Sequence, residues 1–129
     1  MYPFQIFKSY LTTWATGTAI GTGASNTYAV ICVQGATEIN YAAGLVRAYN
    51  GGGFNDLFLP SKDELNVMYQ NKTTIEDTAI LNGGSIFDIS NFYWSSTENQ
   101  SNSAWSQSLD TGVQSPNTCQ YISKVDYFI

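Results

Sequence analysis

The segment Tyr93-Trp94-Ser95-Ser96-Thr97-Glu98 holds the residues best suited to chemistry, because serine can act as a nucleophile and a carboxylate as an acid or base. A serine nucleophile of the triad type needs a histidine base, and the chain contains no histidine, so such a triad is excluded. Glu98, Asp110 and Asp126 could supply a carboxylate pair for glycoside cleavage. Their spacing does not favour that role over solvated charge, and we expect no catalytic residue. Ser95, Ser96 and Thr97 are instead expected to satisfy neighbouring backbone groups, and Glu98 to anchor the turn after it.

Amide and hydroxyl side chains in the second half of the chain are candidates for ligand binding. They donate and accept hydrogen bonds in the adaptable manner of antibody paratopes. The candidates are Asn99, Gln100, Ser101, Asn102, Ser106, Ser108, Asp110, Gln114, Ser115 and Asn117. Each alone is equally well explained as an ordinary solvated position. As a set on one predicted solvent face, they favour binding to a glycan or a protein receptor.

Charge and composition restrict the partners. The formal net charge is −5, and the five basic residues are scattered, at Lys8, Arg47, Lys62, Lys72 and Lys124. Phosphate binding needs a basic patch, so nucleic acid is not an expected partner.

The length of 129 residues and the 43% hydrophobic content indicate one domain, residues 1–129, with a buried core. No apolar run is long enough for membrane insertion, and residues 1–8 lack the pattern of a signal peptide.

The first half of the chain has the signals of short helices. Ser25-Asn26-Thr27 resembles an N-cap cluster before the apolar run 28–34 and Gly35, although a strand over 28–34 stays possible. Residues 42–49 have apolar side chains at helical spacing and end at a run of glycines. The Thr/Gly-rich segment 16–23 lacks the ending of a phosphate-binding loop and is interpreted as a flexible, solvated loop.

The strongest local signal is a capping box. Ser61 and Glu64 have the spacing in which each side chain bonds the other's backbone N–H at the start of a helix. Leu65, Met68 and Tyr69 then form an apolar stripe. This structural role accounts for Glu64 without a catalytic one.

The second half has the pattern of strands. Residues 71–90 are interpreted as an irregular connection, and β-structure is expected from Phe92 onward. Residues 104–110 alternate between two faces, residues 110–112 suit a hairpin turn with Gly112 in the left-handed conformation, and 121–129 suit a terminal strand. The chain is therefore predicted to be an α+β domain, with two to three short helices in the first half and a small, mostly antiparallel twisted sheet in the second.

Cys32 and Cys119 are far apart in the sequence and form neither a CxxC motif nor a metal-type cluster. They could be two buried thiols, or one disulfide worth about 4 kcal/mol in the chain-entropy model. The residues alone leave both alternatives open.

Three segments together resemble the Lcl C-terminal domain family: GGGFNDLFLPSKDELNVMY (51–69), YWSSTE (93–98) and AWSQSLDTG (104–112). The family is typified by G-x-x-D-W-x-L-P-S/T-x-x-E-L, YWSS-S/T-E and AW-x-x-x-F-x-x-G, and the resemblance covers roughly residues 16–129. The matching positions that it identifies as structural framework are Pro60, Ser61, Glu64, Tyr93, Trp94, Ser95, Ser96, Glu98, Trp105, Leu109 and Gly112.

The resemblance implies a C-type-lectin-like fold, related in architecture to the formylglycine-generating enzyme superfamily, and a binding role. Family members are bacterial surface, secreted or phage-borne proteins, and some diversity-generating retroelements use this fold for variable receptor-binding tips. An extracellular, cell-surface or virion location is implied. Ser123 and Asp126 stand where arginines are typical, and only residues 1–11 could supply the usual opening strand, so the domain is a minimal or truncated version.

The same resemblance bears on the remaining alternatives. A bridge between Cys32 and Cys119 becomes the favoured interpretation. An enzyme of the formylglycine-generating kind would need a reactive cysteine motif, which neither cysteine has.

Lectin-type calcium sites use the motifs EPN or QPD followed by WND. Phe54-Asn55-Asp56 resembles only WND, and the oxygens of Glu98, Asn99 and Asp110 are too few to coordinate Ca²⁺. We expect no metal and no cofactor. A structural alternative is a homo-oligomeric tip, such as a trimer, in a fibre or adhesin.

Overall fold

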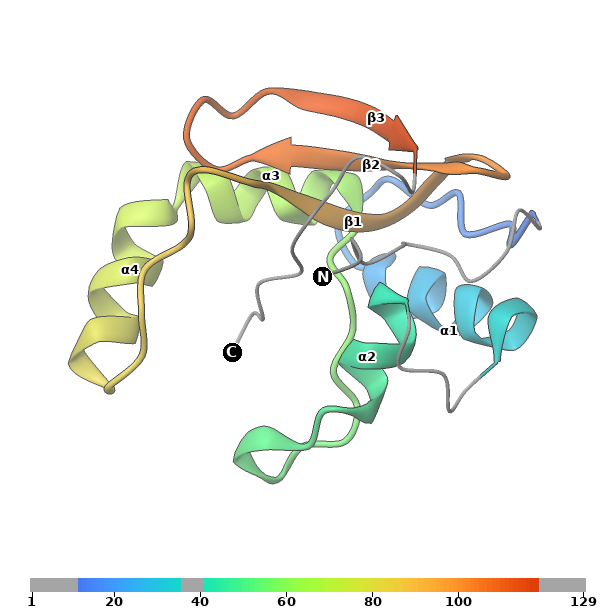
Figure 1. The fold of residues 1–129 in the computed structure, drawn as a ribbon. Helices are drawn as coiled ribbons and strands as arrows, with labels where there is room; N and C mark the ends of the chain where they lie inside the picture. The colour runs from blue at the N-terminus through green and yellow to red at the C-terminus, as the bar shows by residue number, and fades with distance from the viewer. Residues whose placement is uncertain (1–11, 36–40, 119–129) are drawn as a thin grey trace.

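The protein is an α+β domain in a computed structural model that describes residues 12–35 and 41–118 (Figure 1). The described residues form four α-helices, one short 3-10 helix and one sheet of three strands. In chain order the elements are α1 (Gly23–Gln34), α2 (Ala42–Ala48), η1 (Gly51–Gly53), α3 (Lys62–Gln70), α4 (Lys72–Leu81), β1 (Phe92–Gln100), β2 (Ser103–Ser108) and β3 (Gln114–Thr118). The predicted α+β class and the small antiparallel sheet are confirmed, whereas the number of helices was predicted too low.

The sheet is antiparallel in the order β1-β2-β3, so consecutive hairpins build it. Trp94 on β1 is opposite Ser106 on β2, and Ser106 is opposite Ser115 on β3. The register of β1 against β2 shifts between Trp94 and Glu98. Within this irregular stretch the backbone N–H groups of Ser96 and Glu98 donate to Pro60 O and Ala15 O, which lie outside the sheet.

Two apolar clusters cover opposite faces of the sheet. Trp94 and Ala104 share one face and pack with α1 and α2 around the buried Val30. Tyr93 and Leu109 share the other face and pack against Leu65 of α3. Full burial of one such leucine side chain stabilises the fold by about 2 kcal/mol. The strands are therefore covered on both faces.

Helix α3 begins as predicted. The Ser61 hydroxyl accepts from Glu64 N–H at 3.3 Å, and Ser61 N–H donates to Glu64 Oε2 at 2.7 Å, which completes the capping box. Glu64 also accepts from Gly21 N–H through Oε1 at 2.7 Å. The cap therefore fastens the Thr/Gly-rich segment as well as starting the helix.

Helix α1 is a helix rather than a strand, but the predicted N-cap cluster is wrong. The helix begins at Gly23 after Thr22, and Asn26 and Thr27 lie inside it with buried side chains. Gly23 is required because a Cβ there would overlap the Glu64 carboxylate. Gly35 follows the helix with φ 106°, as its predicted C-terminal role requires.

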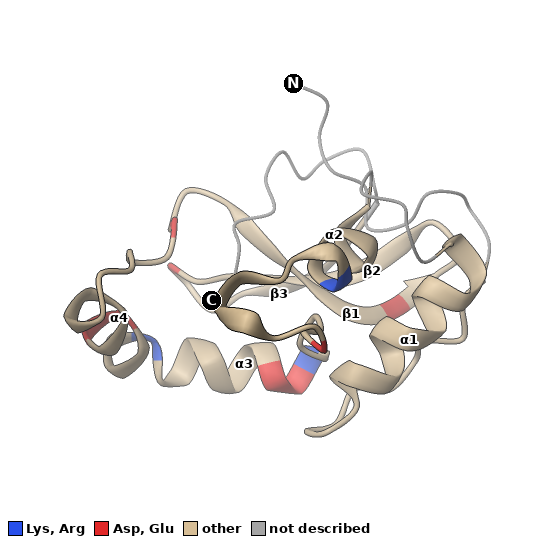
Figure 2. Ribbon diagram, turned by 90° about the horizontal axis from the view of Figure 1, so that it is seen from below, with Lys and Arg blue, Asp and Glu red and all other residues tan. Residues whose placement is uncertain are grey.

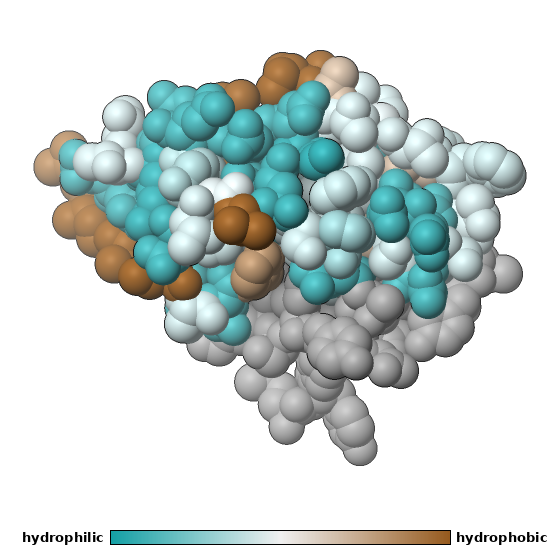
Figure 3. All heavy atoms as spheres, turned by 90° about the horizontal axis from the view of Figure 1, so that it is seen from above, coloured by the Kyte–Doolittle hydropathy of each residue, from teal (hydrophilic) through white to brown (hydrophobic). Residues whose placement is uncertain are grey.

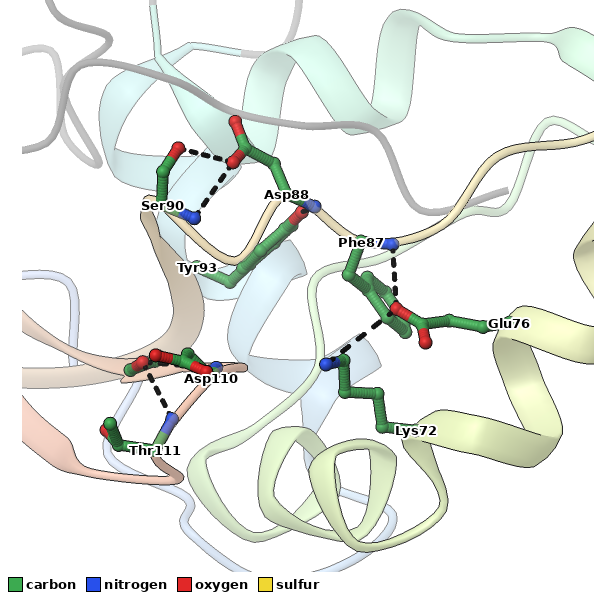
Figure 4. A network of polar contacts seen from close by, with 9 residues as sticks. Lys72, Glu76, Phe87, Asp88, Ser90, Tyr93, Asp110 and Thr111 are labelled. Atoms are coloured by element: carbon green, nitrogen blue, oxygen red, sulfur yellow. Dashed lines mark hydrogen bonds and ion pairs between the residues drawn. The ribbon is translucent and has the colours of Figure 1, made fainter.

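The irregular connection predicted for residues 71–90 is also wrong, because residues 72–81 form α4. Lys72 pairs with Glu76 one turn along it, and Gly83 ends it with φ 80°. The helix buries none of its residues, which explains why no apolar stripe marked it in the sequence. The chain then returns to β1 with Glu76 accepting from Phe87 N–H and the Tyr93 hydroxyl accepting from Asp88 N–H (Figure 4).

Several predictions fall on residues outside the described ranges. They are the opening segment 1–11, the terminal strand 121–129 with Ser123 and Asp126, and Cys119. Within the described ranges, helix α2 begins at Ala42 as predicted, and the glycine run 51–53 follows it. None of the helices there is long and apolar enough to cross a membrane.

The β2–β3 turn yields a test of backbone geometry. Gly112 has φ 78°, as predicted, and an added Cβ would overlap the Tyr69 ring. We expect Gly112→Ala to lower the free energy of unfolding by about 2–4 kcal/mol, because left-handed strain and overpacking add. The control is Gly83→Ala, where φ is 80° and an added Cβ meets nothing, so the loss should be about 1 kcal/mol. Equal losses in urea unfolding would contradict the packing explanation.

Candidate functional site

The hydroxyl groups of the YWSSTE segment bond to other segments of the fold. Ser96 Oγ donates to Pro60 O at 3.2 Å, and Ser96 N–H donates to the same oxygen at 2.7 Å. Thr97 Oγ1 donates to Gly17 O at 2.7 Å and accepts from Lys62 N–H at 2.9 Å. The expectation that these side chains satisfy nearby backbone groups is confirmed. None of them is directed at solvent, since Ser95, Ser96 and Thr97 are all buried.

Asn26 is the central residue that the sequence interpretation missed. Its side chain accepts from Gly17 N–H at 3.1 Å and donates to Gly17 O at 2.6 Å, which satisfies both backbone groups of one residue. Its Nδ2 also lies 3.4 Å from Ser96 Oγ. Asn26 was mistaken for a cap residue because caps and buried amides share the same residue type. Its neighbours Ser25 and Thr27 are polar as well, so no signal in the sequence indicated that Asn26 is buried.

Glu98 fastens the first described segment to β1. Its Oε2 accepts from Thr13 N–H at 3.0 Å and from Thr13 Oγ1 at 2.9 Å, and its own N–H donates to Ala15 O at 2.8 Å. Glu98 and Thr13 are both buried. The prediction that Glu98 anchors the turn after it is therefore wrong: the carboxylate holds a segment 85 residues away.

Trp14 stands between the two residues that Glu98 holds. Its indole is 79% exposed, whereas Thr13 and Ala15 are 2% and 1% exposed. Its φ is 63°, which is an outlier for a bulky residue. Trp14 O accepts from Thr16 N–H at 2.9 Å. No feature of the sequence pattern singled out this residue, because a backbone outlier appears only in coordinates.

Four of the candidates, residues 99–102, form a loop tip where β1 passes into β2. Asn99 and Gln100 are exposed and directly follow Glu98, and Ser101 and Asn102 are half-buried in the turn. Asn99 Nδ2 donates to Ser103 Oγ at 3.3 Å within the hairpin. This group of four stays together, as predicted.

The solvent face predicted for β2 is wrong at Ser106 and Ser108, because both side chains are buried. Ser106 Oγ donates to Ser115 O at 3.0 Å and accepts from Asn117 Nδ2 at 2.6 Å. Ser108 Oγ accepts from the backbone N–H groups of Asp110 and Thr111 at 3.2 Å each. β2 is the central strand of a sheet packed on both faces, so alternation cannot leave a solvated face.

Asp110 and Gln114 lie at the other end of β2 from the loop tip. Six residues in β2 place the two ends about 17 Å apart. Asp110 is exposed, and Gln114 Nε2 donates to Lys62 O at 2.9 Å. The ten candidate residues therefore do not form one surface: the loop tip, with Asn117 near it through pairing to Ala104, is separate from the Asp110 turn.

The other face of β2 belongs to the framework beside α3. Lys62 Nζ lies 3.7 Å from the centre of the Trp105 ring, a cation–π contact. Gln107 is fully buried and donates to Asn66 Oδ1 at 2.9 Å. These contacts agree with the framework role that the family resemblance implied for Trp105.

Cysteine and acidic residues do not assemble into a reactive centre in the described ranges. Cys32 is exposed on α1, so its interpretation as a buried thiol is wrong. A hydrogen bond with Cys32 raises the pKa of the Tyr28 hydroxyl above its ordinary value. The bridge to Cys119 stays a prediction. No group of three His, Cys, Asp or Glu residues that could hold a metal occurs among the residues described.

Charged residues are sparse around the Glu98 contacts. Helix α1 carries none, and Figure 2 shows charged residues concentrated on α3 and α4. Residues 12–35 contain no charged side chain at all, and residues 92–118 contain only Glu98 and Asp110. The described segments that carry Trp14 and the loop tip therefore have polar side chains and few charges.

Comparison of the chain with protein-family models, with curated proteins and with solved structures finds no match.

The contact between Thr13 and Glu98 generates a stability test. We expect Thr13→Val to lower the free energy of unfolding by about 2 kcal/mol, because the carboxylate loses a buried hydroxyl donor without a change of shape. Thr12→Val is the matched control: Thr12 is exposed, so the same substitution should change stability by about 0.5 kcal/mol or less. Urea unfolding followed by circular dichroism measures both. Similar midpoints for the two variants would show that the contact contributes little.

Proposed function

We propose that the chain is a non-catalytic recognition domain that presents the β1–β2 hairpin end to a glycan or protein receptor. The observation that carries the proposal is the sharp change at Glu98. Residues 95–98 are buried in bonds to other segments, whereas Asn99 and Gln100, the next two residues, are exposed amides. A buried, hydrogen-bonded segment followed directly by exposed hydrogen-bond donors and acceptors is the arrangement that a preorganised contact surface needs.

The chemistry of the hairpin end supports recognition rather than turnover. Asparagine and glutamine each offer two donors and an acceptor, but neither is a nucleophile or a general base at neutral pH. The serine and threonine hydroxyls that follow Trp94 are engaged with backbone groups. The formylglycine-generating alternative is weaker, because it has only the exposed Cys32 thiol in its favour.

The family resemblance adds an architecture and a location to this proposal. A C-type-lectin-like arrangement is supported by a framework in which the motif residues Pro60, Ser61 and Glu98 join distant segments. On this proposal the domain works outside the cell, on a cell surface or a virion. A hairpin end that varies without disturbing the framework also suits a retroelement-diversified protein.

The surface is tested by a screen followed by substitution. The folded chain is applied to glycan arrays and to candidate host-surface proteins, and the affinity of the best ligand is measured by calorimetry. We expect Asn99→Ala combined with Gln100→Ala to weaken binding at least tenfold, about 1.4 kcal/mol, because exposed paired hydrogen bonds are lost.

The control lies at the opposite end of β2. Asp110→Ala combined with Thr111→Ala alters two exposed residues and should leave the affinity unchanged. Equal loss in both double variants, or no loss at the hairpin end, would contradict the proposed surface. Absence of binding to any receptor would contradict the function itself.

A second candidate function, a self-associating tip domain, is favoured by one observation. Helix α4 buries no residue, and apolar side chains on it and just after it are exposed: Ile80 by 56%, Leu81 by 86% and Ile86 by 61%. Figure 3 shows hydrophobic atoms gathered along the edge of the molecule where α4 lies. Such a patch is a contact surface in many proteins, and the occupant proposed here is a second copy of the chain.

Light scattering of the purified chain tests this alternative. We expect an oligomer, such as a trimer, that Leu81→Lys converts to a monomer, because a charge in the contact would be desolvated. Thr73→Lys adds the same charge at an exposed α4 position and should leave the mass unchanged. A monomeric wild-type chain over the micromolar range would remove the candidate.

A further inference from the structure

We propose that Trp14 is an aromatic platform on which the apolar face of an uncharged pyranose ring stacks. This rests on the proposed function and narrows it to neutral sugars. Trp14 is not among the ten residues that the sequence predicted for ligand binding. Three observations carry the inference: the exposure of the indole, its backbone conformation, and the uncharged hydroxyl-bearing surroundings.

The side chains of residues 12–16 alternate between inside and outside. Thr13 and Ala15 face the interior and are 2% and 1% exposed. Thr12, Trp14 and Thr16 are exposed. The outward row therefore has one flat aromatic ring between two hydroxyl groups, whereas an indole with a structural role would lie in the inward row.

The backbone of Trp14 is held in a conformation that tryptophan disfavours. A φ of 63° suits glycine or asparagine, and a Cβ there is unfavourable by roughly 1 kcal/mol or more. The neighbours impose it: Thr13 N–H and Oγ1 donate to Glu98, and Ala15 O accepts from Glu98 N–H. Exposed apolar surface combined with backbone strain stabilises nothing in the folded domain. Such outliers are concentrated at ligand sites.

The described residues beside Trp14 in the sequence favour a neutral sugar over an anionic ligand. Residues 12–35 contain no Lys or Arg, so nothing there would pair with a sulfate, carboxylate or phosphate. A pyranose ring has an apolar C–H face for the indole and equatorial hydroxyls at its rim. Threonine hydroxyls and the amides of Asn99 and Gln100 can bond those hydroxyls. These two residues follow Glu98 directly, so they belong to the same end of β1 as Trp14.

The test titrates the chain with oligomers of glucose, mannose, galactose and N-acetylglucosamine, with heparin as the anionic comparison. We expect at least one neutral oligomer to bind and to change the tryptophan fluorescence, while heparin does not bind. Trp14→Gly should weaken that binding at least tenfold in calorimetry. Trp14→Phe keeps a flat ring, so it should retain affinity within a few-fold while the fluorescence response disappears.

Folding is checked in the same variants. Glycine relieves the left-handed strain at position 14, so Trp14→Gly should unfold at a urea concentration equal to or above that of the wild type. Loss of binding by a variant that is no less stable assigns the indole to the ligand and not to the fold. A markedly lower midpoint would overturn the inference, because the indole would then support the structure.

The outcomes separate this inference from the proposed function. If the hairpin double variant loses binding and Trp14→Gly binds like the wild type, the platform is wrong and the recognition surface stands. If the wild type binds only a protein receptor or only heparin, the neutral-sugar specificity is wrong and the recognition function stands. If it binds neither sugar nor protein, both proposals are wrong.

Discussion

Hydrogen bonds between the first described segment and the strand β1 are the constraint on which the rest of the structure depends. Residues 12–22 have little regular structure, so their buried backbone groups need side-chain partners. Asn26 satisfies Gly17, Glu98 satisfies Thr13, and Glu64 satisfies Gly21. One amide and two carboxylates thus replace the backbone hydrogen bonds that a neighbouring β-strand would provide. Apolar packing on both sheet faces becomes possible only after these groups are paired.

That constraint explains why the serine, threonine and glutamate side chains of the YWSSTE segment are engaged in structural hydrogen bonds. Where the register shifts after Trp94, the N–H groups of Ser96 and Glu98 donate to Pro60 O and Ala15 O. The Thr97 hydroxyl between them donates to Gly17 O. The Ser96 and Thr97 hydroxyls bond to backbone groups of other segments, and the Ser95 hydroxyl accepts from Thr97 N–H. A buried, fully engaged polar network also specifies one arrangement of the segments, which an apolar contact of the same area would not.

Features of the fold were predictable where the interactions are local. The Ser61–Glu64 capping box, the left-handed Gly112 and the end of α1 at Gly35 each depend on residues a few positions apart. The misses have non-local causes. Ser106 and Ser108 are buried because helices cover both faces of the sheet, and alternation along one strand carries no information about the second layer. The role of Asn26 could be predicted only with the knowledge that Gly17 lies beside it. Helix α4 has no buried side, so no apolar stripe in the sequence indicated it.

The boundary at Glu98, between buried residues and the exposed Asn99 and Gln100, also determines where substitutions are tolerated. Asn99 bonds to Ser103 inside its own hairpin, whereas Thr97 and Glu98 bond to segments far away in the sequence. A substitution at Asn99 or Gln100 therefore alters exposed chemistry and one local contact. A substitution one or two residues earlier removes a partner from a buried backbone group and destabilises distant segments. The same strand consequently holds the least replaceable and the most replaceable residues side by side, which is the property that a fixed scaffold for a varying recognition surface requires.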